Sequence, residues 1–291
     1  MPDAVLALPR ARRAPTRGPW IVPPLLVLAA LFLYPLALIA RQALAGDGNV
    51  LDWSHFAEVL RSPMFHDALQ HTLVIALSAT LGCLVLGFTL SVLIAFTPFP
   101  GSKVLARLID TFIALPTFLV ALSFTFIYGS AGMLNESLMT LMHVDRPPVD
   151  FLYSQWGVIL SEVTVYTPFA MRPLLAAFSL IDPAQIEVAS SLGSRSLRII
   201  HRIILPAAMP ALIAGGSLCL LLTVNEFGIV LFIGAKDVIT LPLLIYDTAI
   251  QQFDYTTACV IAVVNVALSL GLYGLYRFVI AYFGRRRAGL V

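Results

Sequence analysis

Six long, predominantly apolar runs constrain this chain more than any other feature of its sequence. A helix needs about 20 apolar residues to cross the hydrocarbon core of a bilayer. The runs are long and continuous, unlike the alternating strands of a membrane barrel. The sequence therefore predicts an all-α polytopic membrane protein with six transmembrane helices, at residues 20–42, 71–97, 108–129, 155–179, 207–233 and 257–282.

The composition supports a membrane protein and argues against several other classes. Only 12% of the residues are charged and the net charge is +2, whereas soluble proteins carry about 25% charged residues. We therefore expect the lipid bilayer as the main partner and no nucleic acid. No metal site is predicted, because the histidines are scattered over loops and helix ends without ligand spacing, at His55, His66, His71, His143 and His201.

The placement of Lys and Arg predicts the orientation, because cytoplasmic loops carry an excess of both. If the N-terminus is cytoplasmic, the inner segments hold Arg10, Arg12, Arg13, Arg17, Lys103, Arg107, Arg195, Arg198, Arg202, Arg285, Arg286 and Arg287. We expect residues 1–18 to form a cytoplasmic tail and residues 19–291 a single transmembrane domain with a cytoplasmic C-terminus. The outer segments, 43–70 and 130–154, each predict a short interfacial helix.

The inner segment at about residues 182–205 predicts two short helices that project into the cytoplasm. Asp182 is suited to cap the first helix, with Pro183 at its first position. Gly193 is suited to end that helix as a left-handed residue. Ser194 is then expected to cap the second helix, which Pro206 ends or kinks.

Each of these helices has an apolar face. Leu197, Ile200 and Ile204 share one face of the second helix, opposite its three arginines. A charged loop that obeys the positive-inside rule would explain the arginines, but it would not explain the caps and the apolar faces. Apolar faces outside the lipid need a cover, which predicts a partner protein with a groove for an amphipathic helix.

This segment resembles the EAA signature of permeases from binding-protein-dependent ABC importers. That pattern is Glu-Ala-Ala, three residues, Gly, nine residues, Ile, one residue and Leu-Pro. The chain departs from it at one position, where Val188 replaces the first Ala. The matching residues are Glu187, Ala189, Gly193, Ile203, Leu205 and Pro206.

The resemblance implies a type I ABC importer permease in a bacterial inner membrane. It implies a second permease chain, identical or homologous, and a periplasmic substrate-binding protein. The six matching residues would then couple the permease to a separate cytoplasmic ATP-binding subunit. The chain itself has no G-x-x-x-x-G-K-[ST] motif. We therefore expect a transporter subunit that is not an enzyme and holds no cofactor, with ATP and Mg²⁺ bound by the partner.

Three polar residues inside the predicted spans are candidates for the substrate pathway: Glu162, Asn225 and Glu226. Polar groups in membranes are costly and usually face a cavity or the bundle interior. The alternative is that they form ordinary hydrogen bonds between helices.

The substrate is suggested by a second resemblance. Residues 234–246 and 253–255 are similar to permeases for 2-aminoethylphosphonate uptake. Permeases for ferric iron, sulfate or molybdate, polyamines and thiamine share the general layout and remain alternatives. A stand-alone secondary transporter is the alternative of another class, which paired intramembrane charges or inverted repeats would favour; the sequence has neither. No nucleophile–base arrangement points to a membrane enzyme.

Overall fold

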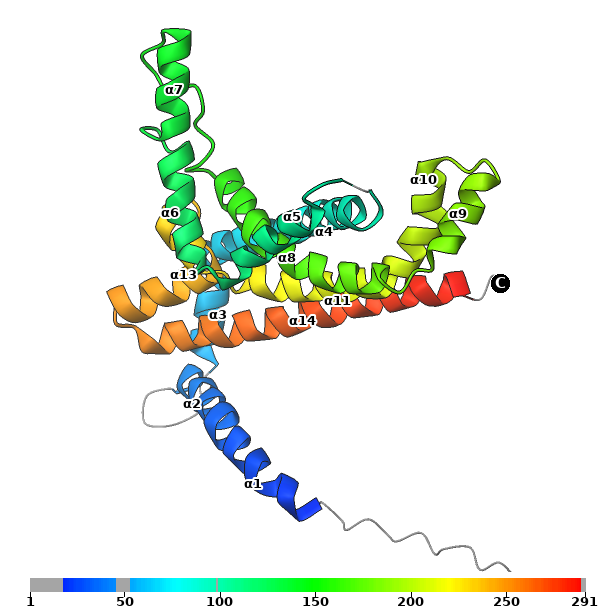
Figure 1. The fold of residues 1–291 in the computed structure, drawn as a ribbon. Helices are drawn as coiled ribbons and strands as arrows, with labels where there is room; N and C mark the ends of the chain where they lie inside the picture. Colours follow the sequence, from blue (N-terminus) through cyan, green and yellow to red (C-terminus); the bar gives the residue numbers. More distant parts are fainter. Residues whose placement is uncertain (1–17, 46–52, 98, 289–291) are drawn as a thin grey trace, which may run out of the picture.

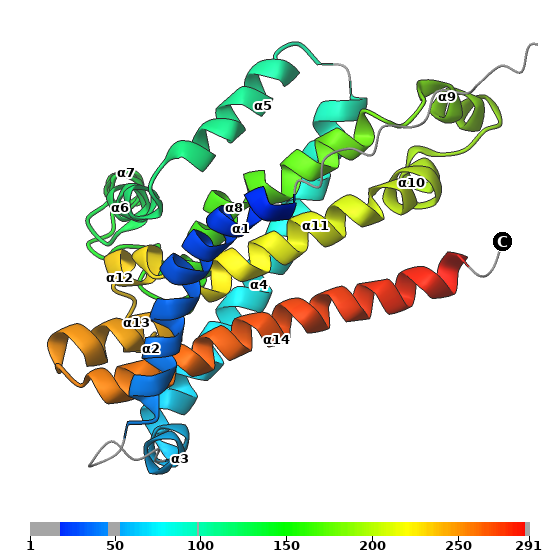
Figure 2. The same ribbon diagram turned by 90° about the horizontal axis from the view of Figure 1, so that it is seen from below.

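The computed structural model describes residues 18–45, 53–97 and 99–288, and every regular element within them is a helix. Three long helices form the centre of the bundle: α4 (Pro63–Phe96), α8 (Gln155–Phe178) and α11 (Leu205–Val224). The last helix, α14 (Tyr255–Ala288), lies along α11 (Figures 1 and 2). The all-α prediction is therefore confirmed.

Small residues allow the central helices to approach closely. A Cβ added at Gly215 of α11 would lie 3.0 Å from the Ala170 Cα of α8. A Cβ at Gly87 of α4 would lie 3.1 Å from the Ala170 Cβ. Lipid offers no hydrophobic drive for helices to associate, so close packing of this kind stabilises a membrane bundle.

The structure has five helices that are long and apolar enough to span a membrane, and six if the bent pair of α8 and α9 (Pro183–Ser191) is one span. The number agrees with the six predicted spans. The second span is longer than predicted, because α4 begins at Pro63 after Ser62 caps it through the Phe65 N–H, at 3.1 Å. The sequence pattern placed that polar first turn outside the membrane, but the helix itself is continuous.

Two predicted spans are interrupted. The third consists of α5 (Ser102–Thr111), the 3₁₀ turn η2 (Phe112–Ala114) and α6 (Thr117–Tyr128), with a break before Pro116. Proline disfavours a helical conformation in the residue that precedes it. The fifth span ends at Val224, and the polar residues that follow separate it from α12 (Gly228–Ile233).

The first span is present, and each of the two predicted outer segments contains a helix. Helix α1 (Gly18–Leu28), the π-turn η1 (Ala29–Leu33) and α2 (Tyr34–Ala43) form the first span, and α2 packs on α14. The predicted tail, residues 1–18, lies outside the described residues except for Gly18. These outer-segment helices are α3 (Ser54–Arg61) and α7 (Met133–Met142). Helix α7 continues α6 in a stretch, Thr117–Met142, that is long and apolar enough to cross a membrane, so the third apolar stretch extends beyond the predicted 108–129.

Helices α6 and α7 form an arm that leaves the bundle (Figure 1). Asn135 is buried at the base of α7. Its Nδ2 donates to the carbonyls of Gly129 and Val149, both at 2.8 Å, and its Oδ1 accepts from the Val149 N–H at 3.0 Å. One side chain therefore fixes both loops that flank α7.

The two ends of the bundle differ. One end holds α9, α10 (Ser196–Ile199) and the end of α14. The other holds α12, α13 (Leu241–Tyr246), the π-turn η4 (Asp247–Gln251) and the start of α14 (Figure 2).

Candidate functional site

Helices α9 and α10 form a hairpin at one end of the bundle. The Asp182 Oδ1 accepts a hydrogen bond from the Ala184 N–H at 3.0 Å, with Pro183 in the first turn of α9. Gly193 follows the helix with φ of +79°. The Ser194 N–H then donates to the Ala189 carbonyl at 3.0 Å. The predicted start and end of the first helix are confirmed.

The predicted cap of the second helix is wrong. Arg195, not Ser194, is the N-cap residue, and α10 begins at Ser196. This helix continues through a π-turn, η3 (Ile200–Ile204), directly into α11. Pro206 lies in the first turn of α11 and does not end the helix. A π-turn changes the hydrogen-bond spacing locally, which offers room for a proline that has no N–H to donate.

The apolar side chains of the hairpin divide into two groups. Ile186, Ala189 and Ile203 pack on a cluster that includes Leu174 of α8 and Ile204. This cluster fixes the base of the hairpin to the bundle.

The second group points outward. Leu192 is 81% exposed and Leu197 is 80% exposed. Leu197 was expected to share a face with Ile200 and Ile204, but the structure separates it from both, since these two pack inside. The other exposed hairpin residues include Glu187, Val188, Gly193, Arg195, Arg198, Arg202 and Pro206, whereas Leu205 is half-buried.

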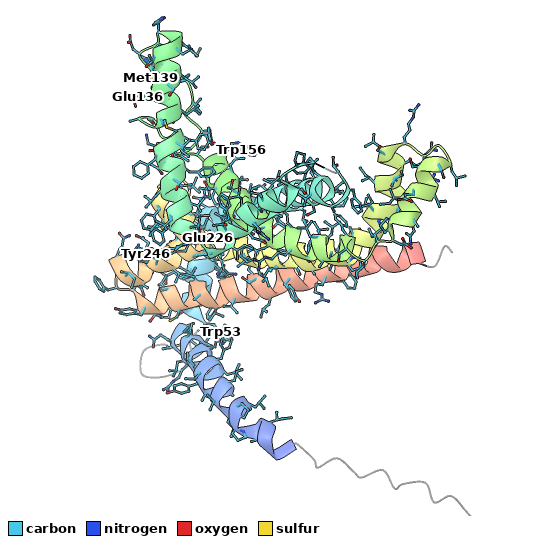
Figure 3. The ribbon with its side chains drawn as sticks, in the orientation of Figure 1. Trp53, Glu136, Met139, Trp156, Glu226 and Tyr246 are labelled. Carbon is cyan, nitrogen blue, oxygen red and sulfur yellow. The ribbon has the colours of Figure 1, made fainter. Side chains whose placement is uncertain are left out.

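Glu226 lies at the interruption between α11 and α12, where Figure 3 shows it near the centre of the molecule. It is 6% exposed. Its Oε1 accepts a hydrogen bond from the Ile229 N–H at 2.8 Å, and its Oε2 accepts one from the Tyr166 hydroxyl of α8. This carboxyl group therefore ties the start of α12 to α8.

Glu162 lies one helical turn before Tyr166 on α8 and is 1% exposed. Both of its carboxyl oxygens lack a hydrogen-bond partner. The group lies close enough to Glu226 and Cys83 to interact electrostatically with both. We call Glu162 and Glu226 the acid pair.

Asn225 lies apart from the acid pair, on the side of α14. Its Nδ2 donates to the Leu221 carbonyl at 2.8 Å and to the Ser269 Oγ at 3.2 Å. Its Oδ1 accepts from the Asn265 Nδ2 at 3.1 Å. Hydrogen bonds between helices therefore account for Asn225, and in part for Glu226, but they leave Glu162 without an explanation.

Two contacts were not predicted from the sequence. Tyr166 was not recognised as the partner of Glu226, although its position four residues after Glu162 places both on one face of α8. The second is the ion pair between Arg172 of α8 and Asp110 of α5, at 3.1 Å. Both of these charged side chains are exposed, so the pair adds little to stability.

Neither a metal cluster nor a disulfide occurs in the described part of the chain. No group of three or more His, Cys, Asp or Glu residues there is arranged to hold a metal ion. Cys83, Cys219 and Cys259 are free thiols.

Comparisons with known proteins agree with this geometry. Residues 87–287 match the family described as "Binding-protein-dependent transport system inner membrane component". The chain is 58% identical over 267 residues to the "Putative 2-aminoethylphosphonate transport system permease protein PhnU" of Salmonella typhimurium, covering 92% of this chain and 93% of the relative.

More distant similarities extend to other transport systems. The sulfate transport system permease protein CysT of Salmonella typhimurium is 28% identical over 263 residues, which cover 89% of this chain and 92% of the relative. A crystal structure of a bacterial ABC transporter involved in alginate import matches 90% of this chain and 94% of its own, with a TM-score of 0.78 and 20% identity. The chain therefore belongs to the family of binding-protein-dependent transport system inner membrane components, and it is a transport permease rather than an enzyme.

Proposed function

We propose that this chain is the permease subunit of an ATP-driven importer for 2-aminoethylphosphonate. The observation that carries the coupling part of this proposal is the α9–α10 hairpin, which is fixed at its base and exposes Leu192 and Leu197. The relative that is 58% identical, and is named for 2-aminoethylphosphonate transport, supports the substrate.

The proposal includes the partners of the importer. A separate ATP-binding subunit would hold ATP and Mg²⁺ and receive the hairpin in a groove. A second permease chain would complete the pathway. A periplasmic substrate-binding protein would deliver the cargo, which the family's description as binding-protein-dependent supports. The membrane is a bacterial inner membrane, with the hairpin and both termini in the cytoplasm. We also propose that residues 19–291 form a single transmembrane domain.

The structure supports a division of roles within the signature. Glu187 is exposed on α9 and available to the ATP-binding subunit. Ala189 and Ile203 hold the hairpin on the bundle. Gly193 supplies the left-handed turn between the two helices. Leu205 and Pro206 begin α11, so they join the hairpin to the transmembrane bundle.

The hairpin connects to two central helices in different ways. It follows α8 across a bend of 77° between α8 and α9. It precedes α11 without a break. A movement of the hairpin would therefore reach both helices near the acid pair. On this basis we assign Glu162 and Glu226 to the substrate pathway or its gate. Asn225 is assigned there as the neighbour of Glu226, at the break where α11 ends.

The substrate is tested by uptake. Cells that lack their own 2-aminoethylphosphonate transport would express the permease with its ATP-binding subunit and substrate-binding protein. We expect uptake of labelled 2-aminoethylphosphonate that excess unlabelled sulfate does not reduce. Uptake of sulfate instead would favour the alternative that the more distant CysT relatives raise. Ferric iron, molybdate, polyamines and thiamine would be tested as competitors in the same assay.

The coupling is tested by crosslinking. A cysteine at the exposed Ser190 of α9, in a chain without its native cysteines, should crosslink to the ATP-binding subunit with a yield that changes with ATP. A cysteine at the exposed Thr140 of α7 is the matched control and should give no such crosslink. ATP-independent uptake without any crosslink at Ser190 would favour a stand-alone secondary transporter.

A further inference from the structure

Among the described residues, Glu162 alone has two buried side-chain oxygens without a hydrogen-bond partner. Its side chain is 1% exposed, yet neither carboxyl oxygen has a hydrogen-bond partner. Burying a carboxyl group without a partner is costly, and proteins normally avoid it. Glu226 is also buried, but Tyr166 and the Ile229 N–H satisfy it. Glu226 therefore has hydrogen-bond partners and Glu162 has none, so of the two acids Glu162 is the one available for a new partner.

Glu226 supplies the one other carboxyl group that interacts with Glu162 among the described residues. Among the described residues, no Lys, Arg or His pairs with either member of the acid pair. Two carboxyl groups that face each other without a cation repel when both are charged. A cationic group that enters such a site favours the ionised form of the acid beside it, whereas a wholly anionic group does not.

The helices around the acid pair include the two that are interrupted, at the break between α11 and α12 and at the break before α6. Helix α12 is bounded by the break at residues 225–227 and by Gly234, whose φ is +61°. Helix α6 begins just after Pro116 and packs on α12. A Cβ added at Gly228 would lie 2.9 Å from the Thr117 Oγ1 and 3.4 Å from the Glu226 Oε1, so both breaks meet at this point. In transporters, binding sites near the middle of the membrane are typically formed by discontinuous helices.

These observations identify a group that Glu162 could bind. A primary ammonium donates up to three hydrogen bonds and carries the charge that the acid pair lacks. Bonds from a cation to a carboxylate are about twice as strong as neutral ones. The cargo of the proposed importer, an aminoalkylphosphonate, carries one primary amine.

We infer that Glu162 receives the ammonium group of the cargo when α12 moves away from α8. This inference rests on the proposed function and names the chemistry that its pathway selects. Glu162 is then a specificity-determining residue, which favours a cargo with an amine over a fully anionic cargo such as sulfate. Glu226 keeps its bonds to Tyr166 and Ile229 in the closed state and is released as α12 moves.

The test uses the complete transporter, reconstituted in proteoliposomes with its ATP-binding subunit and substrate-binding protein. Import of 2-aminoethylphosphonate and ATP hydrolysis are measured together for the wild type and for Glu162→Gln. Import should fall about tenfold or more, because a charge-assisted hydrogen bond is lost. ATP hydrolysis stimulated by the loaded binding protein should stay within about twofold of the wild type.

Two controls sharpen the result. Glu136→Gln removes an exposed carboxylate from α7 and should change neither rate. Glu162→Asp keeps the charge but shortens the side chain by one methylene, and it should import at an intermediate rate. If the Gln variant is poorly folded, the Asp variant still tests the role of the charge. Import of 2-hydroxyethylphosphonate, in which a hydroxyl replaces the ammonium, should not distinguish Glu162→Gln from the wild type.

Three results would count against the inference. Unchanged import of 2-aminoethylphosphonate by Glu162→Gln would remove Glu162 from cargo recognition. A parallel fall in import and ATP hydrolysis, for both cargoes, would assign Glu162 to packing or gating. A wild-type transporter that imports no 2-aminoethylphosphonate would overturn the proposed substrate itself and, with it, the ammonium assignment.

Discussion

The α9–α10 hairpin and the acid pair use side chains in opposite ways. The hairpin exposes apolar residues to water, with Leu192 and Leu197 at its surface. The acid pair buries two carboxyl groups inside an apolar bundle. Each is unfavourable by itself, since water disfavours the leucines and the apolar interior disfavours the acids. The two regions therefore require different partners. The exposed leucines of the hairpin require a protein outside the bundle, and Glu162 requires a group that enters the bundle.

The largest effect is expected at the hairpin surface. Leu192→Asp combined with Leu197→Asp should lower ATP-driven uptake at least about 30-fold, because the loss of even one apolar anchor at an interface costs about 2 kcal/mol or more. The amount of protein in the membrane should not change, since both side chains are exposed. Uptake and co-purification of the ATP-binding subunit are the measurements.

The control for this double variant is Leu141→Asp, at a residue on α7 that is 78% exposed. It places the same charge on another exposed leucine and should leave co-purification unchanged. If the hairpin variant still binds the ATP-binding subunit normally, the comparison between the two regions fails.

The second effect is expected at the acid pair. Tyr166→Phe removes the hydroxyl that donates to Glu226 and leaves a buried carboxyl oxygen without that bond. The free energy of unfolding should fall by about 1–3 kcal/mol, which lowers the melting temperature in detergent by roughly 2–4 °C for each kcal/mol.

The same substitution at the exposed Tyr255 should leave the melting temperature unchanged. A double-mutant cycle with Glu226→Gln separates the Tyr166–Glu226 contact from other effects. Additive losses would mean that the two side chains do not act together.

The third effect returns to the hairpin and concerns its turn. Gly193→Ala should destabilise the hairpin by about 1–2 kcal/mol, because φ of +79° is unfavourable for a residue with a Cβ. No atom lies within 4 Å of the added Cβ, so the effect comes from the backbone conformation alone. Gly271→Ala is matched, since its Cβ is equally unobstructed but it lies inside α14, and it should be neutral or slightly stabilising. Protease sensitivity of residues 182–205 is the measurement, and equal sensitivity of both variants would contradict the prediction.

The smallest effect lies at the far end of the bundle. Asp254 precedes α14, and hydrogen bonds from Thr257 lower the pKa of its carboxyl group. A carboxyl group whose pKa is lower in the folded state stabilises the protein at pH values above its pKa in the unfolded state, which is about 3.9 for Asp. This stabilisation is lost as the pH falls through the pKa of the folded state. The melting temperature of the wild type should therefore fall slightly more than that of Asp254→Asn below about pH 4. Identical pH profiles would show that the cap does not contribute.

The sequence predicted the hairpin better than the acid pair, for a physical reason. The caps at Asp182 and Gly193 are local, so neighbouring residues determine them. The contact between Tyr166 and Glu226 joins residues 60 positions apart, and no periodicity reveals it. The early start of α4 at Pro63 was missed because hydropathy measures lipid compatibility, whereas hydrogen bonding decides where a helix begins and ends.

The cap at Ser194 failed for a related reason. A serine before an apolar face is a sound local signal, but the path of the chain after Gly193 placed Arg195 at the cap position instead. The continuous helix through η3 could not be inferred either, because proline normally ends a helix.

The unbroken passage from α10 through η3 into α11 makes residues Ser196–Val224 a lever of 29 residues. At 1.5 Å for each residue, it is about 44 Å long. A tilt of about 5° around its hairpin end would move the far end by roughly 4 Å, more than the length of a hydrogen bond. A small tilt of this helix about its hairpin end would therefore produce a larger displacement at Val224, next to Glu226, whereas the 77° bend separates α8 from the hairpin.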